Sequence, residues 1–507
     1  HLLEALQAGR TDDGFDLEAL RHVEGLCYRG HDGKVVRTPD RERIVDLDWI
    51  PSPYLTGLFS SYGDGVTTTA VIETNRGCPY GCTFCDWGSA TLSRIRKFSL
   101  ERVYAELEWC AVNRVGRIFV ADANFGIMER DVDIAKKVAE LHSQYGYPKQ
   151  FVTNYAKNTT KYVKQIVQVM TDAGILTEGI LSLQSMDAGT LKTIKRSNIK
   201  LEKYEELARE FRNAKLPLFV DLMLGLPGSS MTSFMDDIQQ CVDREVTPKI
   251  HLTELLVNSP MNDPAYRAEH QIDTGMDGHP FYPTIPGEGG SVRRALVVST
   301  SSFTRHDYEE MQRLRRVFLL CENYGVLRQV SRYVRQETGL REVDLYEQLR
   351  MVARHESDRW PIIALTLNAL PDLMTSPVSW KLWIDEIHRY LVEVCEVPDD
   401  ATLAAVLDVQ HALLPARNRQ FPVVLDLPHD YGGWYNAMIE VKDDGYGLDW
   451  PDRVPPLRSF PPATFTVDDP SGLCNFGLGH RMEHDDYGNW ELQSPVERTM
   501  PAQHLME

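Results

Sequence analysis

The segment 68–85, "TTAVIETNRGCPYGCTFC", joins a short apolar run to three of the chain's nine cysteines. A continuous run of apolar and β-branched residues is typical of a parallel strand that is buried on both faces. Cys78, Cys82 and Cys85 follow this run within eight residues, among two glycines and a proline. The segment therefore predicts a strand that ends in a loop bearing three thiols.

Similar apolar runs recur after this strand and alternate with segments of helical periodicity. The further strands are predicted at 117–122, 150–154, 179–185, 216–228 and 250–257. The helices are predicted at 99–113, with Ser99 as N-cap, and at 131–145, 160–173, 201–214 and 230–243. Right-handed crossovers would wind six such units into a parallel sheet. Because a closed barrel needs eight strands, we expect an α/β fold with a partial (β/α)6 barrel, whose chemistry lies in the loops after the strands.

Composition and charge exclude several classes of protein. The chain has 507 residues, of which 43% are hydrophobic and 25% charged, as in an ordinary globular protein. Its formal net charge of −19 disfavours nucleic acid and anionic membrane surfaces as partners. No window approaches the roughly 20 apolar residues that a membrane span needs. The other six cysteines are scattered and are expected in the core, so a reducing, cytoplasmic location is predicted.

The three clustered cysteines allow three interpretations. They could be free thiols, although their spacing beside turn residues is unusual for buried core cysteines. They could bind zinc, but structural zinc sites normally have two separate ligand pairs, and no second pair is evident in the sequence. They could hold an iron–sulfur cluster through three thiolates. A cluster with four irons and three protein ligands keeps one iron open for a small molecule.

The spacing CxxxCxxC, with Phe84 just before the last cysteine, resembles the signature of the radical S-adenosylmethionine (radical SAM) superfamily. This resemblance implies that Cys78, Cys82 and Cys85 ligate a [4Fe–4S] cluster. It further implies that SAM binds the open iron and is cleaved reductively to a 5′-deoxyadenosyl radical, which abstracts hydrogen from an unactivated C–H bond. The partial barrel of this family agrees with the six strands predicted above.

The resemblance also extends to the ends of the second and fourth strands. In "ADANFG", Asp122 and Asn124 stand where the family holds the amino group of SAM. In "LSLQSMDAGTLKTIKRSN", Gln184 and Ser185 match positions near the ribose of SAM. Arg196, or its neighbour Lys195, matches a position near the SAM carboxylate.

Three more positions complete the predicted SAM site. Gly225 belongs to "DLMLGLPGSS", which resembles the glycine-bearing motif of the fifth strand, against which adenine packs. Val257 occupies the corresponding rim after the sixth strand. Phe84 is expected near adenine. Each residue also has a purely structural explanation, because tight turns need glycine and an aromatic ring beside a cluster excludes water.

The segments around the barrel suggest four parts. Residues 1–65, with a hairpin turn at 30–33, resemble the linker that follows a cobalamin (B12)-binding domain in one branch of the superfamily. Such a domain is therefore expected upstream of the chain, although no Asp-x-His-x-x-Gly motif for cobalt ligation is present. The barrel is predicted at 66–303, a helical domain at 304–395 and a mixed C-terminal cap at 396–507.

The predicted function is that of a radical SAM enzyme for C–H functionalisation. The resemblance to the cobalamin-dependent branch favours a methyltransferase. The alternatives are a radical SAM oxidoreductase or cyclase without methyl transfer, and a non-catalytic iron–sulfur or zinc protein. The implied cofactors are the cluster, SAM and cobalamin. The implied partners are a peptide or small-molecule substrate and an electron donor such as flavodoxin or ferredoxin.

Overall fold

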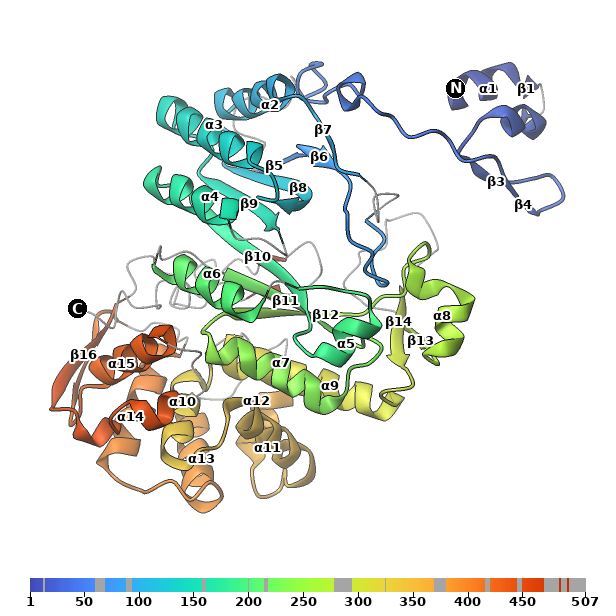
Figure 1. The fold of residues 1–507 in the computed structure, drawn as a ribbon. Helices are drawn as coiled ribbons and strands as arrows, with labels where there is room; N and C mark the ends of the chain where they lie inside the picture. Colours follow the sequence, from blue (N-terminus) through green and yellow to red (C-terminus); the bar gives the residue numbers. More distant parts are fainter. Residues whose placement is uncertain are drawn as a thin grey trace.

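The fold is taken from a computed structural model of the chain (Figure 1). The residues it describes are 1–11, 14–59, 69–87, 94–156, 161–198, 200–213, 218–277, 294–323, 325–368, 380–414, 420–444, 449–468, 483–484 and 490–491. Cys474 lies outside these residues.

A parallel sheet of six strands forms the centre of the molecule. The strands are β5 (Thr69–Ile72), β8 (Arg117–Phe125), β9 (Gln150–Tyr155), β10 (Leu176–Gln184), β11 (Leu218–Leu224) and β12 (Thr247–Leu252). Their spatial order follows their order in the chain, and every neighbouring pair is parallel. The six predicted strands and the partial (β/α)6 barrel are therefore confirmed.

Helices connect these strands and cover one face of the sheet (Figure 1). They are α2 (Leu100–Val112), α3 (Arg130–Tyr145), α4 (Lys161–Asp172), α5 (Ala188–Thr193), α6 (Leu201–Asn213) and α7 (Met231–Asp243). The predicted N-cap Ser99 accepts a hydrogen bond from the Arg102 amide at 3.1 Å. The short α5 was not predicted, because it lies within the strand-to-helix connection after β10.

Both faces of the strands can be assigned from packing. A Cβ on Gly179 of β10 would stand 2.4 Å from the ring of Phe211 on α6, so Gly179 faces the helices. Because side chains alternate along a strand, Ser182 lies on the opposite, interior face of the barrel. Ser182 pairs in register with Asp221 of β11, which pairs in turn with Lys249 of β12, so these residues share the interior face.

An antiparallel hairpin continues the sheet beyond β12. After η5 (Pro260–Asn262) and α8 (Pro264–Glu269), strands β13 (Asp273–Asp277) and β14 (Arg294–Ser299) pair with each other. The Leu255 amide donates to the Ala295 carbonyl at 2.7 Å, and the Val297 amide donates to the Thr253 carbonyl at 2.9 Å. β14 therefore runs antiparallel to the segment that follows β12 and covers that end of the barrel.

The C-terminal half is mainly helical and packs below the barrel in the view of Figure 1. Its elements are α9 (Arg305–Phe318), a π-helical turn (Leu319–Asn323), α10 (Arg328–Thr338), α11 (Glu342–His355), α12 (Pro361–Asn368), α13 (Trp380–Glu393), α14 (Ala401–Leu413), β15 (Val423–Leu427), α15 (Tyr431–Asp444), α16 (Trp450–Arg453), η8 (Leu457–Ser459), β16 (Ala463–Val467), β17 (Glu483–His484) and β18 (Trp490–Glu491). The predicted domain boundaries at 65, 303 and 395 remain predictions.

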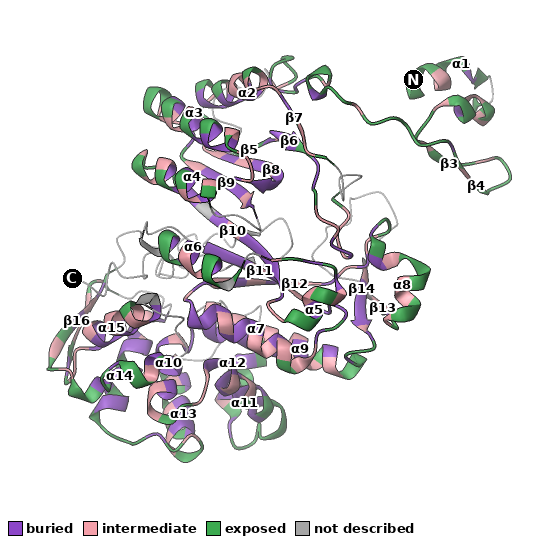
Figure 2. Ribbon diagram, viewed as in Figure 1, coloured by how far each residue is buried: buried purple, intermediate pink, exposed green. Residues whose placement is uncertain are grey.

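The N-terminal residues up to Arg37 extend away from the barrel (Figure 1), whereas residues 47–49 contact it, since the Ser99 amide donates to Asp48 Oδ1 at 3.0 Å. They form α1 (Leu2–Ala8), β1 (Arg10–Thr11), β2 (Gly14–Phe15), η1 (Leu17–His22), β3 (Cys27–Arg29), β4 (Val35–Arg37) and η2 (Leu47–Trp49). β3 and β4 pair around the predicted turn at 30–33. Much of this segment is exposed in Figure 2.

The core extends from the barrel into the helical half, as Figure 2 shows. Cys110, Cys241 and Cys321 are buried in it, as predicted, whereas Cys395 is half-buried. Cys27 is exposed, so its predicted core position is wrong, because β3 belongs to a separate two-stranded hairpin and not to the central sheet. Among the described residues, the structure contains no helix that is long and apolar enough to cross a membrane.

Candidate functional site

The cysteine loop begins after β5, at the carboxyl edge of the sheet, where the sequence predicted it. Its base is a two-stranded ribbon in which β6 (Asn75–Arg76) pairs antiparallel with β7 (Arg96–Lys97). Gly77 follows β6 with a φ of 123°, and a Cβ there would lie 2.6 Å from the Arg94 carbonyl oxygen. Glycine is therefore required where the chain leaves the ribbon and enters the cysteine loop.

Two predicted site residues donate hydrogen bonds to the cysteine sulfurs. Cys78 and Cys82 are buried, and Cys85 is half-buried. The side-chain amide of Asn124 donates to Cys78 Sγ at 3.5 Å, and Arg196 Nη1 donates to Cys82 Sγ at 3.5 Å. Such donors stabilise thiolate charge and are common around iron–sulfur ligands. Asn124 and Arg196 thus approach two of the three sulfurs from β8 and from the end of α5.

The arrangement of the thiols fits the chemistry of a cluster. Among the described residues, no three His, Cys, Asp or Glu side chains are grouped around one point as ligands of a single ion. A [4Fe–4S] cluster does not require such a group, because each thiolate binds a different iron. The half-buried loop with N–H donors at two sulfurs is consistent with that use.

Asn124 also has a buried acceptor beside the cysteine loop. Its Oδ1 is buried and has no hydrogen-bond partner among the described residues, while its Nδ2 contacts Cys78. A buried carbonyl oxygen without a partner costs free energy and is a candidate for a ligand donor. Its position beside a cluster ligand suits the ammonium group that the sequence analysis assigned to Asp122 and Asn124.

Asp122 has a different environment from Asn124. Its carboxylate is fully buried and accepts hydrogen bonds from the backbone amides and side chains of Thr74 and Asn75. Burial raises the pKa of Asp122 to about 7, although these hydrogen bonds oppose the shift. Both carboxylate oxygens are therefore occupied by the strand exit that leads into the cysteine loop.

Arg196 rather than Lys195 faces the cysteine loop. Its guanidinium lies 5.9 Å from the centre of the Phe84 ring and also donates to the Ser182 carbonyl oxygen. Arg196 is buried, and the exposed Lys195 adopts a positive φ of 52° at the end of α5. Of the two residues, Arg196 therefore lies beside the cysteine loop and Phe84, and its contact with the SAM carboxylate remains a prediction.

Gln184 and Ser185 lie at the carboxyl end of β10, where the pairing with β11 is irregular. Gln184 has a positive φ of 69°, which is uncommon for a residue with a Cβ. The Ser185 hydroxyl donates to Asp237 of α7 at 2.7 Å, and the Met186 amide donates to the same carboxylate at 2.7 Å. Burial raises the pKa of Asp237 to about 6 despite these bonds. Asp237 therefore holds the turn that presents Gln184.

The last two predicted residues lie after β11 and β12. Gly225 has a φ of 96°, and a Cβ there would stand 3.0 Å from the Val297 carbonyl oxygen of β14. This close approach gives a structural reason for glycine. Val257 is 81% exposed on the segment after β12 and has no packing role in the core. Its predicted contact with SAM remains a prediction.

The sequence analysis did not identify a polar group on the interior face of the barrel. The Ser182 hydroxyl donates to Asp221 Oδ2 at 2.7 Å, and His251 Nε2 lies 3.2 Å from Asp221 Oδ1. Burial opposes ionisation of Asp221, but His251, Ser182 and Lys249 outweigh it and lower its pKa. A charged residue inside an apolar strand run is the sequence signal that could have identified Asp221.

Comparison with known proteins identifies the class of the barrel. Residues 72–241 match the family model described as the radical SAM superfamily. The matched range begins at the last residue of β5, includes the cysteine loop and strands β8 to β11, and ends within α7. The chain therefore contains a radical SAM domain, and [4Fe–4S] and SAM are the cofactors that this family implies.

Two curated proteins with sequences similar to this chain are methyltransferases. The chain is 35% identical over 358 residues to the cobalamin-dependent radical SAM methyltransferase TokK of Streptomyces tokunonensis, covering 68% of this chain and 51% of that protein. It is 34% identical over 341 residues to the 2-(S-pantetheinyl)-carbapenam-3-carboxylate methyltransferase of Streptantibioticus cattleyicolor, covering 65% of this chain and 49% of that protein. The chain thus spans about half the length of these curated relatives.

Among solved structures, the chain resembles the radical S-adenosylmethionine methyltransferase TsrM from Kitasatospora setae with cobalamin and a [4Fe–4S] cluster bound. The TM-score is 0.44 and the sequence identity 14%, over 62% of this chain and 64% of that chain.

Proposed function

We propose that this chain is the catalytic part of a cobalamin-dependent radical SAM methyltransferase that methylates a C–H carbon of its substrate. The observation that carries the proposal is the 35% identity over 68% of the chain to a protein of that name. The cysteine loop at the carboxyl edge of the barrel supports it, because parallel barrels carry their chemistry there. Binding of cobalamin belongs to the same proposal, because that relative is named as cobalamin-dependent.

The described residues supply the binding functions that this chemistry needs. Cys78, Cys82 and Cys85 would hold the cluster, whose chemistry when bound is one-electron reduction of SAM. Asn124 would accept a hydrogen bond from the SAM ammonium group through Oδ1. Arg196 donates to Cys82 Sγ and would neutralise negative charge beside it.

The remaining predicted residues would bind the adenosine part of SAM. Gln184 and Ser185 would face the ribose at the end of β10, where Asp237 holds Ser185 and the Met186 amide. Gly225 and Phe84 would border adenine, and Val257 would close this side through its exposed segment.

We propose a small anionic molecule as the substrate. The relative from Streptantibioticus cattleyicolor is named for a carboxylate substrate. In this chain, the Lys249 ammonium group and the His251 imidazole lie on the interior face beside Asp221. Both side chains could bind a carboxylate inside the barrel. A peptide substrate is the alternative.

The same proposal includes an electron donor and a cellular location. A reduced flavodoxin or ferredoxin would supply the electron, and a cytoplasmic location would keep the cluster and the free thiols reduced.

Two measurements test the proposal. Protein purified anaerobically and reconstituted should contain about four irons per chain, an expectation from the cluster type. Replacing Cys78, Cys82 and Cys85 by Ala should abolish iron binding, whereas Cys321→Ala, in the core, should not. Stoichiometric zinc without iron would contradict the proposal.

The second measurement uses the full reading frame, expressed with hydroxocobalamin and then supplied with SAM, reductant and the carbapenam carboxylate named above. A methyltransferase should yield 5′-deoxyadenosine together with S-adenosylhomocysteine. Formation of 5′-deoxyadenosine alone, with no bound corrinoid, would instead support the non-methylating alternative.

A further inference from the structure

The cysteine loop is attached to the barrel through a short region around Thr74. The ladder between β5 and β8 ends at the pair Ile72 and Val120. Two residues later the chain turns away from the sheet and enters the ribbon of β6 and β7. The Phe98 amide, just after β7, donates to the Thr74 carbonyl at 3.1 Å. Both ends of the cysteine loop therefore meet at Thr74.

Asp122 connects this junction to β8 after the backbone ladder has ended. Its Oδ1 accepts from the Thr74 amide at 2.8 Å and from the Asn75 amide at 3.2 Å. Its Oδ2 accepts from Asn75 Nδ2 at 2.6 Å and also contacts the Thr74 hydroxyl. All three residues are at most 4% exposed. One carboxylate thus takes the place of several ladder hydrogen bonds at the foot of the loop.

The same strand carries the residue that contacts the first cysteine. Asn124 lies two positions after Asp122, and its side chain donates to Cys78 Sγ. Asp122 therefore links Thr74, four residues before Cys78, to the backbone that presents Asn124.

We propose that Asp122 is a positioning residue for the cluster: it holds the foot of the cysteine loop against β8, so that Cys78 and Asn124 keep the relative placement that cluster binding needs. The inference rests on the proposed function, since it assumes that the loop binds a cluster. This role differs from direct contact with SAM. If Asp122 contacted SAM, its loss would weaken SAM binding and leave the cluster intact. Loss of a positioning residue impairs retention of the cluster itself.

The test compares Asp122→Asn with a matched variant, Asp131→Asn. Asp131 is also fully buried near the end of β8, and it accepts from the amides of Gly126 and Met128 at 2.8 and 3.1 Å. It makes no hydrogen bond to the cysteine loop among the contacts described. An asparagine at 122 keeps the shape but turns one acceptor into a donor that faces the donors of Thr74 and Asn75.

The measurements are iron content after anaerobic reconstitution and the rate at which a chelator removes iron, with circular dichroism as a check on folding. Losing charged hydrogen bonds at the loop should speed iron release in Asp122→Asn on the order of tenfold to a hundredfold. Asp131→Asn should release iron at the wild-type rate. Equal release from wild type and Asp122→Asn, or equally fast release from both variants, would overturn the inference.

A third variant covers the case in which Asp122→Asn does not fold. Thr74→Val removes one hydroxyl donor and keeps the side-chain shape. It should fold and release iron faster than wild type, and wild-type release from it would overturn the inference. If the wild-type protein itself binds no iron, the proposed function fails first, and this result is distinguishable from a failure of the positioning role alone.

Discussion

Buried carboxylates at the barrel rim and in the helical half have opposite electrostatic environments. At the rim, burial raises the pKa of Asp122 to about 7 and those of Asp131 and Asp237 to about 6. Where the barrel meets the helical half, burial acts in the same direction on Glu245, between α7 and β12, but Arg332 and Lys442 outweigh it and lower its pKa. The difference lies in the partners, because the neutral N–H and O–H donors at Asp122 and Asp237 offset desolvation only in part, whereas the two cations at Glu245 outweigh it.

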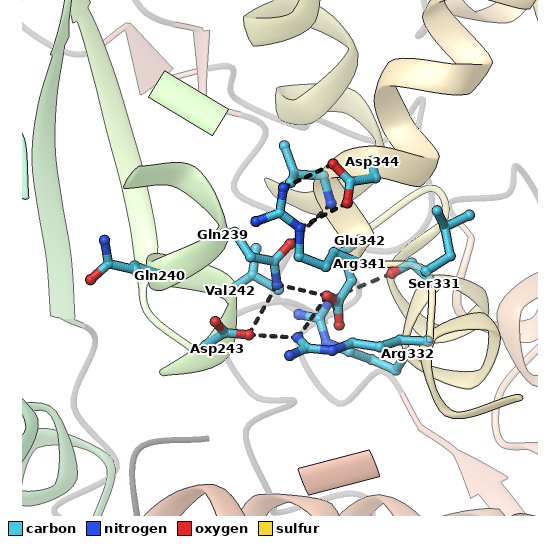
Figure 3. Close-up of polar contacts among 12 residues, drawn as sticks. Gln239, Gln240, Val242, Asp243, Ser331, Arg332, Arg341, Glu342 and Asp344 are labelled. Atoms are coloured by element: carbon cyan, nitrogen blue, oxygen red, sulfur yellow. Dashed lines mark hydrogen bonds and ion pairs between the residues drawn. The ribbon is translucent and has the colours of Figure 1, made fainter. Parts of the chain in front are cut away.

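Figure 3 shows part of the charged network that joins α7 to α10 and α11. Arg335 Nη1 donates to Asp243 Oδ1 at 2.5 Å and to Glu342 Oε2 at 2.9 Å. Gln239 Nε2 bonds the same two carboxylates at 3.0 and 2.8 Å. This network connects charges of both signs within the protein. The rim acids Asp122, Asp131 and Asp237 instead accept hydrogen bonds from backbone amides of the loops.

Breaking the charged network should have the largest effect on stability. Arg332 has no exposed side-chain surface and pairs with Glu322 at 2.6 Å and Glu245 at 3.2 Å. Arg332→Met leaves these buried carboxylates without their main cation, which should lower the free energy of unfolding by about 3–5 kcal/mol. Arg305→Met removes an exposed pair with Asp273 and should cost less than about 1 kcal/mol. Chemical denaturation measures both, and equal losses would contradict the comparison.

The two environments should also give opposite dependences of stability on pH. Burial opposes ionisation of Glu310, but Arg354, Arg350 and Arg313 outweigh it and lower its pKa to about 2 from 4.5. Its stabilising contribution is present above pH 4.5 and should be lost as the pH falls toward 2, with a total of about 3 kcal/mol. Glu310→Gln should therefore flatten the acid limb of the stability curve.

Asp237 should behave in the opposite way. Its folded pKa of about 6 exceeds the usual 3.8, so its contribution is present below pH 3.8 and is lost as the pH rises through 6. Asp237→Asn should remove this decline, again about 3 kcal/mol. Chemical denaturation of both variants between pH 3 and 7 measures how the free energy of unfolding depends on pH. If that free energy changed with pH in the same way in both variants, the predicted opposite dependences would be refuted.

A smaller effect is expected at the rim acceptor. Asn124→Leu removes the buried Oδ1 that lacks a partner among the described residues. Losing a hydrogen bond to a charged ammonium should weaken SAM binding by about tenfold to a hundredfold. Because the same change removes the donor to Cys78 Sγ, wild type and variant are compared at equal iron content. Asn113→Leu, at the end of α2, is the control and should bind SAM normally. Calorimetry on the reconstituted protein measures the affinity for SAM. Unchanged affinity in Asn124→Leu would exclude this residue from the SAM site.

The smallest effect is expected at Val257. Its side chain is 81% exposed, so Val257→Ala should change the free energy of unfolding by less than about 0.5 kcal/mol. If the segment contacts SAM through its backbone, SAM affinity should also stay within about threefold of wild type. A larger loss of affinity would assign the side chain itself to the adenine site.

The sequence predicted the elements of the barrel because their signals are local. A strand buried on both faces must be apolar along its length, and a helix covering the sheet must repeat its apolar residues every third or fourth position. For this reason the six strands, the helices between them and the position of the cysteine loop agree with the structure. The β13–β14 hairpin was not predicted, because its pairing with residues 253–255 depends on contacts distant in sequence.

The sequence analysis predicted the residues of the candidate site, but it gave Asp122 and Asn124 the same role, at the amino group of SAM. Asp122 and Asn124 stand two positions apart in one motif, and the sequence cannot distinguish their functions. In the structure, Asp122 reaches Thr74 and Asn75, whereas Asn124 reaches Cys78. Likewise, the sequence cannot show that Arg196 and not Lys195 lies beside the cysteine loop, because this depends on the direction in which the chain leaves α5.

The sequence by itself determined the kind of sheet, the order of its strands and the three thiols at its carboxyl edge, since periodicity and ligand spacing are properties of neighbouring residues. Only the tertiary structure decided which carboxylates meet cations and which meet neutral donors. Asp122 bonds Thr74, which lies 48 positions away. Glu245 pairs with Arg332 and Lys442, which lie 87 and 197 positions away. Such pairings are set by the packing of whole elements, and the charge state of a buried group follows from them.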